Sequence, residues 1–137
     1  MRALSPSTIH PPFSGYSHGI AVPAGHRLIA CSGQLGITAE GDVPMSAQAQ
    51  ARIALENLEA ILAEDGLDRR AIVRLNAYVT GREHLAGYMA ARNAFFEGVT
   101  PPPASTLMIV SGFARPEFHV EIECLAAAPA SAEEPPQ

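Results

Sequence analysis

Residues 118–125 read Phe-His-Val-Glu-Ile-Glu-Cys-Leu, and this stretch decides the fold class. Apolar and polar side chains alternate in it, which is the period-two pattern of a β-strand with one covered face. The apolar side chains expected on the covered face are Phe118, Val120, Ile122 and Cys124. The opposite face carries His119, Glu121 and Glu123. Two carboxylates there are either the solvated surface of an edge strand or include a glutamate placed in a cleft as proton shuttle or water activator.

Other short stretches also favour strands. They are residues 16–22, 27–31, 72–79 and 106–110. The run at 27–31, Arg-Leu-Ile-Ala-Cys, predicts a buried strand that Ser32-Gly33-Gln34 then ends. The segment Ser32-Gly33-Gln34 offers a hydroxyl and backbone N–H groups, which suit the binding of a carboxylate or an oxyanion. It is equally consistent with an ordinary turn.

Two stretches have the periodicity of amphipathic helices. The first begins after Ser46, a good N-cap residue. Gly66 can adopt the left-handed backbone conformation that commonly ends a helix. Its apolar positions at helical spacing are Ile53, Leu58, Ile61 and Leu62. The second runs from about residue 82 to residue 97 and ends at Gly98. Its apolar stripe is expected to be Leu85, Met89, Ala90 and Phe96.

These elements follow one another in the order β-β-α-β-α-β-β, which predicts a two-layer α+β domain with two helices packed on one mixed sheet. The chain has 137 residues, the size of one domain. Residues 4–13 are rich in Pro and Ser and predict an irregular arm. We expect a single domain over residues 1–127 and a flexible Ala/Pro/Glu-rich tail over residues 128–137, with fraying from Ala126 onward.

Composition narrows the chemistry. All nine basic residues are arginines, so a lysine Schiff base and a lysine general base are excluded. The formal net charge is −5, and no basic run exceeds Arg69-Arg70, which disfavours a nucleic-acid partner. No apolar run reaches the roughly 18–20 residues that span a bilayer. Cys31 and Cys124 are expected to be buried thiols in a reducing compartment, with one disulfide as the alternative, so we expect a soluble cytoplasmic protein.

Motifs for metals and phosphates are not apparent in the sequence. None of the five histidines has a partner at helical or zinc-type spacing. Neither a glycine-rich phosphate loop nor a Gly-x-Ser-x-Gly elbow occurs. We therefore expect no metal and no cofactor.

Four segments together resemble a known family. They are Gly15-Tyr16-Ser17-His18-Gly19, the run LIACSGQL at 28–35, the run QARIALENLEAIL at 50–62, and Pro102-Pro103-Ala104 followed later by Val120-Glu121-Ile122-Glu123. In this order they resemble the RidA (YjgF) family of reactive-intermediate imine deaminases, over about residues 5–127. The resemblance implies the chorismate-mutase-like fold and a homotrimer with pockets at its subunit interfaces. It also implies hydrolysis of enamines and imines, such as 2-aminoacrylate, without a cofactor.

The resemblance also assigns roles to individual residues. Glu121 corresponds to the glutamate that positions the attacking water. Tyr16, Ser32 and Gly33 correspond to substrate-binding positions of the opening motif and of the "SGQ" strand end. The substrate-binding arginine of the family has no counterpart, because Ser105 stands where it is expected.

Further departures surround that position. Met89 and Arg92 replace the Asn and Tyr that members often carry. The loop before Glu121 is about one residue longer and contains Arg115. We expect Ser105, Thr106 and Met89 to line the pocket, and either Arg115 or Arg92 is a possible substitute for the missing arginine.

Three functions follow as hypotheses. The first is an atypical enamine or imine hydrolase in which Glu121 activates water, with a small-molecule substrate other than 2-aminoacrylate. The second is a non-catalytic metabolite-binding or regulatory trimer. The third is a pathway-specific hydrolase of a larger, aromatic-derived amine. Since the chain has no lysine, any imine handled here arrives with the substrate.

Overall fold

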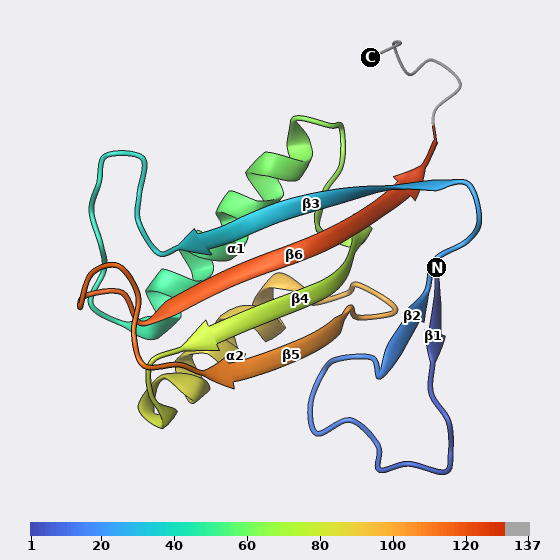
Figure 1. Cartoon of the computed structure of the whole chain (residues 1–137), viewed down its shortest axis with the longest axis horizontal. Coiled ribbons are helices and arrows are strands. Elements are labelled where there is room, and N and C mark those ends of the chain that lie inside the picture. The colour runs from blue at the N-terminus through green and yellow to red at the C-terminus, as the bar shows by residue number, and fades with distance from the viewer. Residues whose placement is uncertain (131–137) are drawn as a thin grey trace.

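Four strands form one mixed sheet in the computed structural model, which describes residues 1–130 (Figure 1). In spatial order they are β3 (His26–Leu35), β6 (Val120–Pro129), β4 (Ile72–Val79) and β5 (Ala104–Ile109). Strand β6 pairs antiparallel with both β3 and β4, whereas β4 and β5 are parallel. The segment 118–125 therefore supplies most of an inner strand and not an edge strand.

Both long helices cover the same face of this sheet (Figure 1). They are α1 (Ala47–Ala63) and α2 (Leu85–Phe95), and short 3-10 helices at Arg69–Ala71 and Arg82–His84 precede β4 and α2. The predicted N-cap is confirmed, because the Ser46 hydroxyl accepts a hydrogen bond from the Ala49 N–H at 3.1 Å. Gly66 has a φ of +72° in the turn after α1, where other residues would be strained. The predicted two-layer α+β architecture is confirmed.

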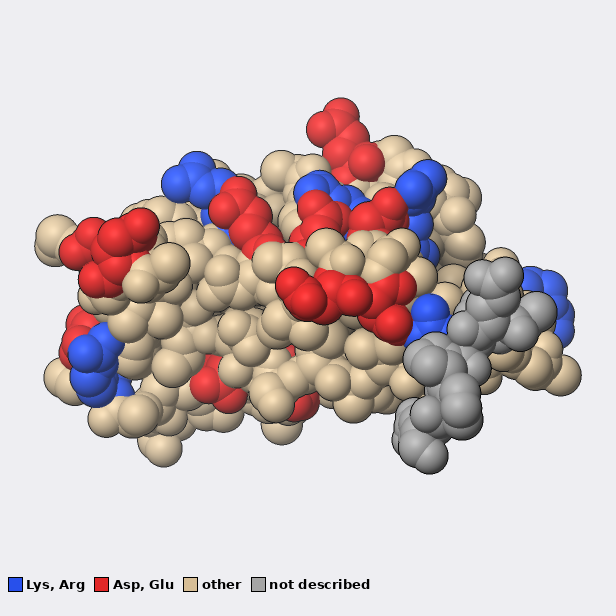
Figure 2. All heavy atoms as spheres, turned by 90° about the horizontal axis from the view of Figure 1, so that it is seen from above, with Lys and Arg blue, Asp and Glu red and all other residues tan. Residues whose placement is uncertain are grey.

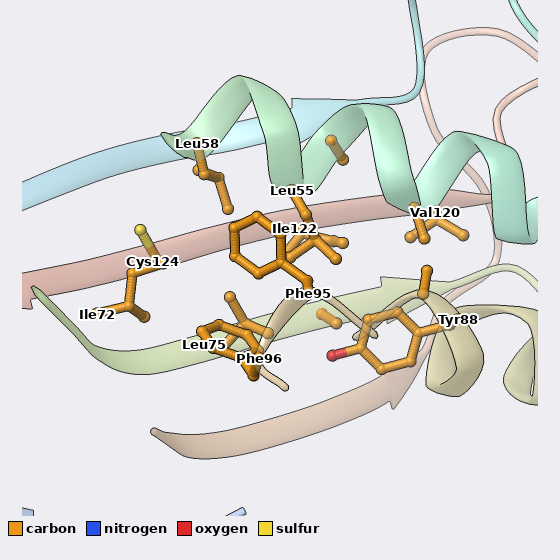
Figure 3. Close-up of a cluster of buried hydrophobic side chains, with 14 of the residues drawn as sticks. Leu55, Leu58, Ile72, Leu75, Tyr88, Phe95, Phe96, Val120, Ile122 and Cys124 are labelled. Atoms are coloured by element: carbon orange, nitrogen blue, oxygen red, sulfur yellow. The ribbon is translucent and has the colours of Figure 1, made fainter. Parts of the chain in front are cut away.

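The core lies between the helices and the covered face of the sheet (Figure 3). Val120, Ile122 and Cys124 of β6 point into it, as the alternation predicted. Leu55, Leu58 and Leu62 of α1 are fully buried against them. Each fully buried side chain of this size contributes about 1.5–3 kcal/mol to folding. The opposite face of the sheet, called the open face below, is not covered by any helix of residues 1–130.

The N-terminal segment differs from the prediction. Residues 2–4 form β1 (Arg2–Leu4), which pairs antiparallel with β2 (Gly19–Ala21) in a separate two-stranded sheet. The predicted irregular arm at 4–13 therefore begins as a strand, and the predicted strand at 16–22 is shorter. Three strands, not two, precede α1. The pairing joins residues far apart in sequence, so local periodicity gives no sign of it.

The predicted ends of two other strands are wrong, and the predicted face of α2 is right only in part. Strand β3 does not end at Ser32 but continues to Leu35, because a bulge between Cys31 and Gln34 absorbs one extra residue. Strand β6 does not fray at Ala126 but runs to Pro129, paired with β3. The predicted apolar stripe of α2 is confirmed for Phe96, which belongs to the core, and for Leu85 and Met89, which pack against it, and it is wrong at Ala90, which is exposed. The buried residues within α2 are Tyr88, Ala91, Arg92 and Phe95. Most of the predicted tail, residues 131–137, lies outside the described residues.

The two cysteines are buried free thiols, as predicted, and do not form the disulfide that was the alternative. They are register partners on β3 and β6 and both belong to the core. Burial and the neighbouring Cys31 raise the pKa of the Cys124 thiol well above its usual range. Cys124 is therefore protonated near neutral pH and is not a nucleophile.

Membrane-spanning helices and metal sites were searched for among the described residues. Within residues 1–130, no helix is long and apolar enough to cross a lipid bilayer. In the same part of the chain, no group of three or more His, Cys, Asp or Glu side chains is arranged to hold a metal ion.

A single buried glutamine fixes the start of β6. Gln50 on α1 is fully buried, and its Nε2 donates to the carbonyls of Pro44 and Glu117 at 2.8 and 2.9 Å. Its Oε1 accepts from the His119 N–H at 2.8 Å. This side chain therefore joins α1 to the loops before α1 and before β6. It sets the position from which Glu121 extends.

Replacing Gln50 tests this connection. We expect Gln50→Met to lower the free energy of unfolding by about 2–4 kcal/mol, because buried backbone groups lose their partners. Gln48→Met is the matched control, since Gln48 is exposed on the same helix and should leave the value within about 0.5 kcal/mol. Chemical denaturation measures both. Equal stabilities for the two variants would contradict the proposed role of Gln50.

Candidate functional site

Glu121 lies on the open face of the sheet, directly over the backbone of Gly33. A methyl group placed on Gly33 would be 2.6 Å from Oε1 of Glu121, so the carboxylate occupies the space that a side chain would fill. The bulge in β3 brings Ser32 and Gly33 to this position. Two of the predicted site residues, Gly33 and Glu121, are therefore in contact, and Ser32 is exposed beside them.

The neighbouring Glu123 differs from Glu121 in its partners. Its Oε1 accepts hydrogen bonds from the Tyr78 hydroxyl at 2.6 Å and from Asn76 Nδ2 at 3.4 Å. The hydrogen bond to Glu123 raises the pKa of Tyr78 above its ordinary value, because it favours the neutral phenol. Glu121 has no hydrogen bond or ion pair within the described residues. Of the two carboxylates, Glu121 is therefore the one available to bind water.

A second group of polar side chains lies at the other end of the sheet, near the start of the edge strand β5. Ser105 is the register partner of Leu75, so it lies on the helix-covered face. The Tyr88 hydroxyl is close to Ser105 and Arg92. Tyr88 is fully buried, and its hydroxyl oxygen interacts electrostatically with Ser105 and Arg92. Burial raises the pKa of Tyr88, while Arg92 and Ser105 act in the opposite direction.

The opening segment lies along β5. Ser17 bridges Ala104, and its N–H donates to the Pro103 carbonyl at 3.2 Å. The Ser17 hydroxyl donates to the Pro102 carbonyl at 2.7 Å. These contacts bring the predicted site residue Tyr16 to the edge that carries Ser105. The Tyr16 hydroxyl accepts from the Phe13 N–H at 3.3 Å.

The other three predicted site residues have contacts of their own. Thr106 is exposed and its hydroxyl accepts from Arg74 Nη2 at 2.7 Å. Met89 is half-buried and packs against the core. Arg115 forms an ion pair with Glu117 at 3.0 Å and stacks 4.7 Å from the ring centre of Phe118. Because Arg115 has a carboxylate partner, it is a weaker candidate for a substrate anion than Arg92.

The two groups are on opposite faces of one sheet. Glu121 and Gly33 lie on the open face, whereas Ser105 and Tyr88 lie on the helix-covered face. One small molecule cannot touch both groups of the same chain. Surface hollows of about 260–370 Å³ occur elsewhere on residues 1–130, and in five of them none of the predicted site residues forms the lining.

Sequence reasoning did not single out Gln50 or Tyr88. Each lies on a helix face whose other residues are apolar. A polar residue at such a position is the sequence signal that could have identified them. Gly36 was also missed. A methyl group there would be 2.4 Å from the Gln50 Cα, so the position admits only glycine.

Charges of both signs are interspersed over the face shown in Figure 2, without a continuous basic patch on that face. Several arginines are paired with carboxylates. Arg69 forms a hydrogen-bonded ion pair with Glu59 at 2.6 Å, and Arg70 does so with Asp68 at 2.6 Å. These pairs hold the pKa of Glu59 below its usual range and lower that of Asp68 to about 2.

Comparisons with known proteins identify relatives of this chain in sequence and in fold. The sequence model of the family described as "Endoribonuclease L-PSP" matches residues 8–128. The 2-iminobutanoate/2-iminopropanoate deaminase of Escherichia coli is 31% identical over 124 residues, which cover 89% of this chain and 91% of the relative. A RutC family protein of Haemophilus influenzae is 34% identical over 103 residues, 73% of this chain and 78% of the relative. A crystal structure of a conserved Rid family protein from Yersinia pestis has a TM-score of 0.82 and 32% identity, and the match covers 93% of this chain and 98% of that one.

Proposed function

The chain belongs to the RidA (YjgF) family, whose sequence model carries the description endoribonuclease L-PSP, and from this premise we propose that it hydrolyses the C=N bond of a small imine or enamine. The observation that supports the proposal is the unpartnered Glu121 carboxylate over Gly33. The net charge of −5 argues against RNA as the substrate, since phosphate contacts need clustered cations.

Glu121 is suited to act on water. In the proposed reaction the substrate is the protonated imine. The Glu121 carboxylate accepts a proton from water as the water oxygen bonds to the imine carbon, and the C=N π electrons move to the nitrogen, so a neutral carbinolamine forms. Glu121 then gives this proton to the amine. The C–N bond breaks, ammonia leaves, and the hydroxyl proton passes to solvent as the carbonyl forms. An enamine enters the same route after protonation at its carbon.

A second copy of the chain is part of the proposal. Because Glu121 and Ser105 lie on opposite faces, a complete pocket needs the Glu121 group of one copy and the Ser105 group of another. The family resemblance implies three copies with three such pockets. The open face supports this arrangement, since Leu28 and Met108 on it are 67% and 53% exposed. Apolar side chains of this size on an exposed sheet favour an interface.

Residue 105 sets the proposed substrate apart. Serine has no charge, so the substrate is not held by a cation at this position, and we propose that it differs from 2-aminoacrylate. Tyr16 and Ser105 at the edge of β5, together with Ser32 beside Gly33, would orient it. Thr106 and Met89 lie further away and would act at the rim.

Glu121→Gln tests the proposed reaction. We expect at least a 100-fold loss of ammonia release from a panel of imines and enamines, because the variant cannot accept the proton. Glu123→Gln is the matched control on the same strand and face and should retain activity within about threefold. Equal rates for the wild type and Glu121→Gln would contradict the role of Glu121. Ligand-dependent melting shifts without turnover in the wild type would favour a binding protein instead.

Gly33→Ala tests the placement of the carboxylate. Gly33 does not have a positive φ, so alanine fits the backbone, and the added methyl displaces only the flexible Glu121 carboxylate. We expect activity to fall about tenfold or more, since small displacements of reacting groups are costly, while the free energy of unfolding changes by less than about 1 kcal/mol. Gly112→Ala, whose methyl meets open space, is the control. Full activity in Gly33→Ala would show that the carboxylate position is not critical.

A further inference from the structure

Two histidine rings stack at the end of the sheet where β6 begins. The ring centroids of His84 and His119 are 4.2 Å apart, and the ring planes are inclined by 20°. His84 precedes the first residue of α2, and its side chain makes no capping hydrogen bond. His119 precedes the first residue of β6. The stack therefore joins the start of the helix to the start of the strand that carries Glu121 (Figure 1).

Two hydrogen bonds hold the backbone at this point. The Thr80 N–H, just after the end of β4, donates to the His119 carbonyl at 3.1 Å. The His119 N–H donates to Gln50 Oε1 at 2.8 Å. Because side chains alternate along a strand, Glu121 lies two residues further on and on the same face as His119. A displacement of residue 119 therefore displaces the strand start from which Glu121 extends.

One proton on the stack has a counter-charge, and a second does not. The Glu83 carboxylate lies 3.7 Å from His84 Nε2, although 73% of the Glu83 side chain is exposed. Among residues 1–130, no carboxylate pairs with the ring of His119. Two protonated rings at this spacing repel each other. The N-terminus of α2 also carries partial positive charge, which opposes a cation there.

Other charged groups near the stack do not change this balance. In the loop before β6, Glu117 is already paired with Arg115 at 3.0 Å. Arg82, in the 3-10 helix before α2, is exposed and adds a positive charge. On β6, Glu121 is displaced from the stack by about 7 Å along the strand, too far for an ion pair. The contacts from α1 and β4 are neutral, because they come from the amide of Gln50 and from a backbone N–H.

We propose that His84 and His119 form a pH-sensitive latch that holds the start of β6 against the start of α2. The latch is closed while the pair carries at most one proton, and the second proton opens it. Because imidazoles titrate between about pH 5 and 8, opening occurs under mildly acidic conditions. The unfolded chain, in which the rings are apart, then binds more protons than the folded chain, so stability falls as the pH falls. Opening also loosens the placement of Glu121, so hydrolysis falls with it, and this consequence rests on the proposed function.

Exchange of backbone amide protons tests the latch directly. We expect the protection factors of the Thr80 and His119 amides to fall at least about fivefold between pH 7.5 and pH 5.5 in the assembled wild-type protein, because their hydrogen bonds open with the stack. His84→Phe keeps a stacked ring that cannot be protonated, so we expect less than a twofold change. His26→Phe is the control and should behave as the wild type, since His26 has no stacking partner among the described residues.

Urea denaturation provides a second readout. We expect the midpoint of the wild type to fall between pH 7.5 and pH 5.5, and His84→Phe to remove at least half of that loss. His119→Phe removes the other titratable ring and should reproduce both effects if His84→Phe fails to fold. A merely structural stack predicts that these variants lower the midpoint equally at both pH values and leave the pH dependence of the protection factors unchanged. That result would overturn the proposal.

The latch and the proposed reaction can fail separately. Absence of imine hydrolysis by the wild type at every pH would refute the reaction, while amide exchange and urea midpoints still decide the latch. Amides that open only in the wild type, together with identical pH profiles of kcat/KM in the wild type and His84→Phe, would overturn the link from the latch to Glu121.

Discussion

The alternation of side chains along β6 is the constraint on which the rest of the structure depends. Strand β6 lies inside the sheet between β3 and β4, and the helices cover only one of its two faces (Figure 1). Val120, Ile122 and Cys124 must enter the core, so the glutamates between them must lie on the open face. A shift of one residue in register would bury two carboxylates. The carboxylate proposed to act on water is thus placed by the same packing that stabilises the domain.

Much of the fold follows from local patterns. The strands over 72–79 and 118–125, the Ser46 cap and the layering of two helices on one sheet were predictable, because each depends on periodicity or on capping within a few residues. The parts that were not predictable depend on distant pairing. Strand β1 forms only against β2, and the run Ala126–Pro129 has no alternation but continues as a strand against β3. Ala-rich and Pro-rich composition predicted a loose segment there, and long-range hydrogen bonding overrides it.

The site was predictable only in part, for a related reason. Glu121 and Gly33 stand out in sequence, and they are in contact. Ser105 stands out too, but the sequence does not reveal that it lies on the opposite face. Gln50, Tyr88 and Arg92 are buried because of tertiary contacts. Helical periodicity counts apolar positions only, so it does not predict that these three residues are buried. The predicted stripe on α2 is right only in part, since the buried side of that helix includes an arginine.

The proposed pocket combines the Glu121 carboxylate of one copy with the Ser105 group of the next. Mixed assemblies test this most directly. Glu121→Gln subunits cannot accept the proton, and Ser105→Trp subunits fill the opposite wall of the pocket, so we expect each variant to be nearly inactive alone. The two are combined in equal amounts and allowed to assemble, and imine hydrolysis is measured. If pockets form between copies, chance pairing restores about a quarter of them, so the mixture should regain about a quarter of wild-type activity. Activity no higher than the average of the two separate variants would contradict the account.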